Sequence, residues 1–173
     1  MASNIEIKAR FEDLLKARRL AAAIGSRKRA ILLQTDTYFD VKQGRLKTRE
    51  IRGDERRAEL IWYERANRAT ARTSEYQVVP IDHPNELKLA LGGALGIVQV
   101  VRKRRELWMY KNVRIHLDRV EKLGNFVELE AVVGGRYTSR LSRRNLQVVK
   151  AALGISDAML VPVSYSDLLP RRG

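Results

Sequence analysis

The 173-residue sequence contains no cysteine, which excludes disulfide bonds and thiolate metal sites. Its first residues lack the basic start and apolar core of a signal peptide, and no apolar run approaches membrane-spanning length. With two histidines in all, the chain also lacks the ligands of a histidine-rich zinc centre. It has no internal repeat and no linker rich in proline, glycine or serine. We therefore expect one cytoplasmic domain, residues 1–173, with no membrane association.

Acidic residues are also scarce relative to basic ones. Lysine and arginine total 34 against 20 aspartates and glutamates, a formal net charge of +14. Such a protein either has an anionic partner or tolerates strong self-repulsion. Nucleic acid, a compact polyphosphate and a membrane surface are the candidate partners, and the distribution of the charges has to decide between them.

The apolar periodicity indicates a mixed fold. Helical spacing covers residues 11–24, 83–95 and 138–153, and Gly25 and Gly154 end the first and the last of these. Alternation typical of strands covers nine segments: 4–10, 31–40, 44–51, 57–65, 73–80, 97–105, 106–111, 112–120 and 125–132. Many hairpin-linked strands with few helices predict an α+β sheet or barrel.

Many charged residues lie inside these strands at a spacing of two, so they share a strand face. The sets are Glu6 with Lys8, Lys47 with Arg49, Lys103 with Arg105, Arg114 with His116 and Asp118, and Glu128 with Glu130. Each set alone fits the solvent-facing side of a half-buried sheet. Together, their separation by sign favours a barrel lined with cations and carboxylates, because like charges on neighbouring positions repel unless a counter-ion lies between them. Such a tunnel would hold a polyanion and the oxygen-loving cations Mg²⁺ or Mn²⁺.

Several motifs resemble those of one family. Residues 4–10 (NIEIKAR) are similar to the N-terminal E-x-E-x-K motif of the CYTH, or triphosphate tunnel metalloenzyme, family, in its Asn-first variant. The segments QTDTYFD (34–40), GRLKTR (44–49), VRKRR (101–105), VRIHLD (113–118) and LGNFVELE (123–130) resemble its later strands, in order. The ending SYSDLL (164–169) resembles the tail of the class IV adenylyl cyclase-like branch.

The resemblance implies an eight-stranded antiparallel β-barrel (the triphosphate tunnel) with helices packed outside. It implies Mg²⁺ or Mn²⁺ as cofactor, and as metal ligands Glu6, Asp118, Glu128 and Glu130. The implied triphosphate-binding residues are Lys8, Lys47, Arg49, Arg65, Lys103, Arg105 and Arg114. The candidate catalytic residues are Lys8 and Tyr38.

Two positions depart from the family pattern. Asn4 replaces the first glutamate of the motif and removes one negative charge, although an amide oxygen can still bind a metal or orient water. Some hydrolytic members pair the tyrosine matched by Tyr38 with a lysine. Arg65 stands where that lysine is sought, and arginine is a poor general base because it stays protonated.

Three functions remain open at this point. The leading hypothesis is a metal-dependent triphosphatase acting on tripolyphosphate, thiamine triphosphate or a nucleoside triphosphate. The alternatives are an adenylyl cyclase that forms cyclic AMP and pyrophosphate, and a non-catalytic module that binds polyphosphate or RNA. The basic exterior permits electrostatic contact with nucleic acid, and a homodimer is permitted. We expect Trp62 and Trp108 to pack on the outer side of the barrel under helices, and His116 to have a structural role.

Overall fold

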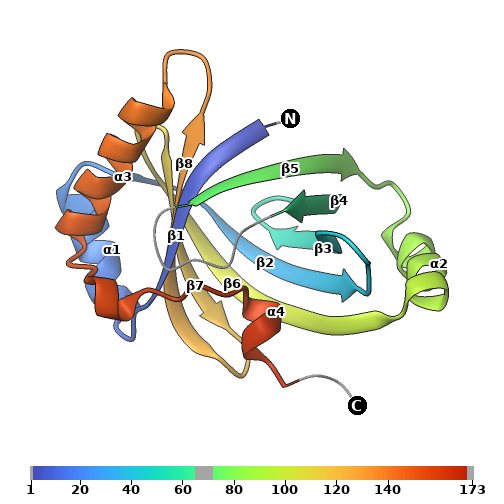
Figure 1. The fold of residues 1–173 in the computed structure, drawn as a ribbon. Coiled ribbons are helices and arrows are strands. Elements are labelled where there is room, and N and C mark those ends of the chain that lie inside the picture. The colour runs from blue at the N-terminus through green and yellow to red at the C-terminus, as the bar shows by residue number, and fades with distance from the viewer. Residues whose placement is uncertain (1, 65–71, 171–173) are drawn as a thin grey trace.

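The computed structural model describes residues 2–64 and 72–170 and contains eight strands in a closed antiparallel barrel (Figure 1). The strands are β1 (Ala2–Arg10), β2 (Arg27–Phe39), β3 (Arg45–Gly53), β4 (Arg57–Glu64), β5 (Arg72–Pro80), β6 (Ile97–Tyr110), β7 (Val113–Val120) and β8 (Gly124–Val133). Their order around the barrel is β1-β5-β4-β3-β2-β6-β7-β8, and β8 pairs with β1 to close the circle. The predicted α+β barrel is confirmed.

Four α-helices pack around the strands. They are α1 (Leu14–Ala23), α2 (Pro84–Leu95), α3 (Ser139–Ala152) and the short α4 (Tyr165–Leu168), with a 3-10 turn at Asp157–Met159. The three helices expected from the periodicity are present, and α4 is an addition. Asp13 begins α1 by accepting a hydrogen bond from the Lys16 backbone amide at 2.9 Å. Among the described helices, none is long and apolar enough to cross a membrane.

The sequence predicted nine strands, whereas the described residues form eight, because segments 97–105 and 106–111 belong to the single strand β6. No turn residue separates Arg105 from Glu106, so the chain continues in extended form through the run of charges. Glu106 points to the outer side, where Arg18 of α1 contacts it at 2.6 Å. β6 pairs along its length with β2, which begins at Arg27 rather than at residue 31.

The main hydrophobic core lies outside the barrel, between its outer surface and helices α1 and α3. Outward side chains of β1, β7 and β8, such as Ile5, Ile115 and Leu129, pack there with Leu146 and Val149 of α3. Burying such apolar side chains is the main term that holds helices to a sheet. Trp108 belongs to this core, as predicted.

Two polar residues have specific places in this packing. Asn145 interrupts the apolar stripe of α3, and its Nδ2 donates to Oδ1 of buried Asn112 at 2.8 Å. Asn112 in turn donates to the Val132 carbonyl at 2.7 Å, so the polar break ties α3 to the barrel. Trp62 is only half-buried, and its indole donates to the Gln43 carbonyl in the β2–β3 turn.

Candidate active site

Strand alternation turns the charged residues inward, where they line a cavity of ≈ 510 Å³. This volume is in the range of small-molecule sites. Ten of the predicted site residues line it: Glu6, Lys8, Tyr38, Lys47, Arg49, Lys103, Arg105, Arg114, Glu128 and Glu130. Asp118 lies directly behind Arg105 and is 0% exposed. Arg65, also predicted, lies outside the described residues.

Asp118 holds the cations of β6 in place. Its Oδ1 accepts from Arg105 Nε at 2.7 Å, and its Oδ2 accepts from Arg105 Nη2 at 2.6 Å and Lys103 Nζ at 3.3 Å. A fourth donor, the Tyr165 hydroxyl, lies 2.9 Å from Oδ2. Burial alone would raise the pKa of Asp118, but the charges of Arg105 and Lys103 outweigh it and hold that pKa well below its ordinary value. Asp118 is therefore ionised and fully engaged.

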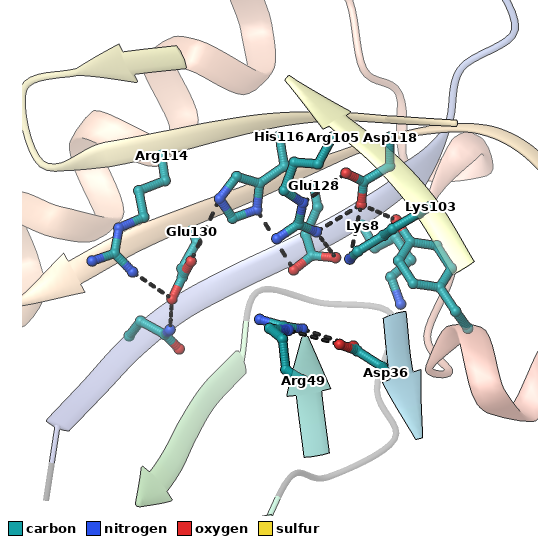
Figure 2. A network of polar contacts seen from close by, with 12 residues as sticks. Lys8, Asp36, Arg49, Lys103, Arg105, Arg114, His116, Asp118, Glu128 and Glu130 are labelled. Atoms are coloured by element: carbon teal, nitrogen blue, oxygen red, sulfur yellow. Dashed lines mark hydrogen bonds and ion pairs between the residues drawn. The ribbon is translucent and has the colours of Figure 1, made fainter. Parts of the chain in front are cut away.

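Asp36 of β2 plays the same part for the cations of β3, on the other side of β6 from Asp118 (Figure 2). It accepts from Lys47 Nζ at 2.7 Å and from Arg49 Nε and Nη2, each at 2.8 Å. Burial opposes the ionised form of Asp36, yet the charges of Arg49 and Lys47 lower its pKa well below the ordinary value. Sequence reasoning did not select this residue. Its signal was the alternation that places Gln34, Asp36 and Tyr38 on one strand face.

Lys47 also lies beside Tyr38, because β2 and β3 pair these two residues directly. Lys47 Nζ is 3.3 Å from the Tyr38 hydroxyl. Burial and the neighbouring Arg49 lower the pKa of Lys47 to about 7, although Asp36 works in the other direction. Burial raises the pKa of Tyr38 well above its ordinary value, so its hydroxyl keeps its proton. A lysine thus lies beside Tyr38, on the adjacent strand.

Carboxylates gather on the wall formed by β1, β7 and β8. His116 lies between Glu128 and Glu130, with Nδ1 3.9 Å from Glu128 Oε1 and Nε2 3.9 Å from Glu130 Oε2 (Figure 2). Burial and the charge of Arg105 lower the pKa of His116, which favours the neutral ring. Arg105 Nη2 is 3.6 Å from Glu128 Oε2, and Arg114 Nη1 is 3.4 Å from Glu130 Oε1.

Two features of these carboxylates bear on whether a divalent metal fits among them. Glu6 and Glu130 are directly opposite each other in the β1–β8 pairing, which brings two carboxylates together on this wall beside Arg114. Asn4, 3% exposed, donates through Nδ2 to Glu130, while its buried Oδ1 has no hydrogen-bond partner. Within the described residues, no three histidine or acidic side chains are already assembled around one point. Mg²⁺ needs no such cage, because it usually takes one or two carboxylates and completes its shell with water and substrate phosphates.

The segment before and within α4 closes one end of the tunnel. The backbone amide of Val161 donates to the Lys8 carbonyl at 2.8 Å, and Lys8 Nζ donates to the Val163 carbonyl at 3.0 Å. The Tyr165 ring lies under two ammonium groups, with its centroid 4.0 Å from Lys8 Nζ and 4.9 Å from Lys103 Nζ. Sequence reasoning gave no site role to Tyr165.

The fold is shared with known proteins. A family model described as the CYTH domain matches residues 2–165. The chain belongs to the CYTH domain family. Comparison with curated proteins finds no match.

Solved structures of similar fold cover nearly the whole chain. The PH1012 protein of Pyrococcus horikoshii has a TM-score of 0.82 and 24% identity, over 96% of this chain and 99% of that one. A putative adenylate cyclase from Vibrio parahaemolyticus has a TM-score of 0.74 and 18% identity, over 95% and 96%. The HpAC1 protein of Hippeastrum, described as a putative adenylyl cyclase with a dominant triphosphatase activity, has a TM-score of 0.65 and 14% identity, over 97% and 93%. One of these neighbours is thus described as having a triphosphatase activity, and two are described as putative adenylyl cyclases.

Proposed function

We propose that this CYTH protein is a divalent-metal-dependent triphosphatase that hydrolyses a triphosphate in its tunnel, with tripolyphosphate as the simplest substrate. One observation carries the proposal. A lysine with a pKa of about 7 lies beside a buried tyrosine, on the wall of a tunnel that also carries fixed cations and a group of carboxylates. This combination would provide phosphate binding, metal binding and a proton acceptor in one cavity.

The cations would bind the phosphates. Asp36 and Asp118 hold the guanidinium groups of Arg49 and Arg105 in fixed orientations, so little conformational entropy is lost when an anion binds. Arginine also matches phosphate oxygens through paired hydrogen bonds. Lys8, Lys103 and Arg114 complete the set of cations that we assign to the substrate.

The carboxylates would bind Mg²⁺ or Mn²⁺. We assign Glu6, Glu128 and Glu130 to the metal, with the free oxygen of Asn4 as a further ligand or a partner for metal-bound water. A bound divalent ion neutralises phosphate charge and lowers the pKa of a bound water. We assign Asp118 the role of positioning Arg105 and Lys103. We prefer this role to metal binding because both of its oxygens already accept hydrogen bonds.

Lys47 and Tyr38 would handle the proton. With a pKa of about 7, a large part of Lys47 is neutral at physiological pH and able to accept a proton from the attacking water. Tyr38, 3.3 Å away, would donate a hydrogen bond to that water or to the phosphate oxygen. Lys8, the other predicted catalytic residue, is held at the closed end by Val163 and fits phosphate binding there.

The aromatic lining favours hydrolysis over cyclisation. Cyclisation requires a nucleoside held inside the cavity, and a base is usually stacked on an aromatic face. Three of the tyrosines in the lining instead face a lysine ammonium. Lys47 lies 5.2 Å from the Tyr38 ring centroid and 5.6 Å from that of Tyr63, and Lys8 lies 4.0 Å from that of Tyr165. Adenylyl cyclisation remains the second candidate function, supported by the resemblance of the C-terminal segment and by fold neighbours described as putative adenylyl cyclases.

The test is product identification. The protein is incubated with tripolyphosphate, thiamine triphosphate and ATP under Mg²⁺ and under Mn²⁺, and phosphate products and cyclic AMP are quantified. We expect orthophosphate without a cyclic product, and loss of activity in the double variant Glu128→Gln/Glu130→Gln. Glu121→Gln, at an exposed carboxylate outside the tunnel, is the matched control and should be as active as wild type. Cyclic AMP with pyrophosphate as the main products would refute the hydrolase. Full activity in the double variant would refute a metal site at β8.

A further inference from the structure

The tunnel does not account for the charge of this protein. Its described lining contains seven lysines and arginines against six acidic residues, a difference of one. The chain as a whole carries +14. The described lining therefore accounts for almost none of the excess, and many of the other described lysines and arginines are exposed outside the cavity. The question is whether these cations are scattered or gathered.

Arginines gather on the outer face of β3, β2, β6 and β7. The strand register places four residues in one row across these strands: Arg52, Leu33, Arg104 and Arg119. Arg102 lies two residues before Arg104, on the same side of β6. All five side chains are exposed. We use the name outer arginine row for the four arginines of this face: Arg52, Arg102, Arg104 and Arg119.

The large helices do not cover this face. α1 and α3 lie against β1, β7 and β8, and Figure 1 shows both on one side of the barrel. α2 lies at the opposite side and contacts β2 and β3. Leu33, between Arg52 and Arg104, is still 52% exposed. The row is therefore accessible to a large partner.

The row is electrostatically unfavourable without a partner. Arg104 and Arg119 are directly opposite in the β6–β7 pairing, and like charges in that position repel. Arg104 contacts Glu106 at 2.9 Å, but Glu106 is shared with Arg18. Among the described residues, no carboxylate is within ion-pair distance of Arg52, Arg102 or Arg119. Stability does not explain this arrangement, whereas binding of a polyanion does.

The composition of the row indicates phosphate groups. Every cation in it is arginine, whose planar fork matches phosphate oxygens, and no lysine is interleaved. The row contains no aromatic residue on which a base could stack, and one leucine is too little apolar surface for membrane insertion. From these observations we propose that the outer arginine row binds nucleic acid through its backbone phosphates, independently of base sequence and separately from the tunnel.

The test measures the salt dependence of RNA binding. A 20-nucleotide single-stranded RNA with a 5′-hydroxyl and a 3′-fluorophore is titrated with the full-length protein, and anisotropy is recorded between 50 and 300 mM salt, about the range over which counterion release is usually resolved. The variant is Arg52→Gln/Arg102→Gln/Arg119→Gln. The matched control is Arg140→Gln/Arg143→Gln/Arg144→Gln, which removes three exposed arginines from α3. Far-ultraviolet circular dichroism of both variants reports that the barrel is intact, and triphosphatase activity is measured separately.

The expected result follows from counterion release. Each lost phosphate contact lowers the slope of log Kobs against log salt by about 0.7 for a single strand, so the row variant should lose about 2 units of slope. That loss corresponds to roughly 100-fold weaker binding at 0.1 M salt. The α3 control should bind within about twofold of wild type, and tripolyphosphate at a concentration that just saturates the tunnel should not displace the RNA.

Four results would overturn the proposal. The first is no RNA binding by the wild type at 100 mM salt, and the second is an equal loss of RNA affinity in the row variant and in the α3 control. The third is displacement of RNA by tripolyphosphate in proportion to tunnel occupancy. The fourth is binding of heparin or of phosphatidylserine vesicles without binding of RNA. None of them bears on hydrolysis in the tunnel, which the activity measurement reports separately.

Discussion

Replacing Asp118 by asparagine is the sharpest test of how the tunnel is built. Asp118 is 0% exposed and accepts hydrogen bonds from Arg105, Lys103 and Tyr165. Asparagine keeps the shape but removes the charge, and it directs an NH₂ group toward these donors. Removing one partner of a buried ion pair costs about 3–5 kcal/mol, because the other charge is left buried and unpaired. For a domain of this length, we expect a melting temperature lower by roughly 6–20 °C.

The measurement is urea unfolding followed by far-ultraviolet circular dichroism, in EDTA so that no divalent ion contributes. Asp118→Asn should lower the free energy of unfolding by about 3–5 kcal/mol with an unchanged m-value. The control Glu121→Gln should change it by less than about 0.5 kcal/mol. A loss below about 1 kcal/mol for Asp118→Asn in EDTA, with a large rise in the metal concentration needed for activity, would refute the reasoning. Asp118 would then be a metal ligand, as the family resemblance implies.

Three further predictions concern single side chains. The turnover rate of the wild type should rise as the pH increases through about 7, because the neutral form of Lys47 is the active one. The variant Lys47→Arg should be about 100-fold slower, and its pH–rate profile should lack this inflection. A wild-type rate that is flat from pH 6 to 9 would contradict this role. Tyr165→Phe should lower the free energy of unfolding by about 2 kcal/mol in urea titrations, because the charged Asp118 loses one donor; an unchanged stability would show that this hydrogen bond contributes nothing. Asn4→Ala should raise the half-saturating Mn²⁺ concentration about 10-fold in activity assays, and an unchanged value would show that its buried oxygen plays no part in metal binding.

The barrel and its charged lining were predictable because both depend on local periodicity. Glu128 and Glu130 alternate with apolar residues, and this pattern alone places them on one face of a strand. The pattern failed at residues 102–106, where consecutive charges hide the alternation and led to the division of β6 into two strands. That continuity depends on pairing with β2, which the local sequence does not contain.

The contacts inside the tunnel were not predictable, because they depend on strand register and chain closure. Asp36 faces Arg49, and Tyr38 faces Lys47, only in the register that the β2–β3 hairpin adopts. A one-residue slip would turn these side chains to the other face. Tyr165 reaches Asp118 across 47 positions of sequence, through a helix of four residues that no periodicity signals. These long-range contacts fix the chemistry of the site, while the local patterns fix its scaffold.

The central claim is that a water molecule attacks a triphosphate in this tunnel. The most direct measurement lets the protein act on tripolyphosphate and on ATP in H₂¹⁸O, in a buffer that contains Mg²⁺ and no Mn²⁺, and records ³¹P NMR spectra of the products. An ¹⁸O atom shifts the resonance of the phosphorus atom to which it is bound. Hydrolysis predicts one ¹⁸O in the products of each turnover with either substrate, and no cyclic AMP. Pyrophosphate without ¹⁸O, formed from ATP together with cyclic AMP, would contradict the account and assign the tunnel to cyclisation.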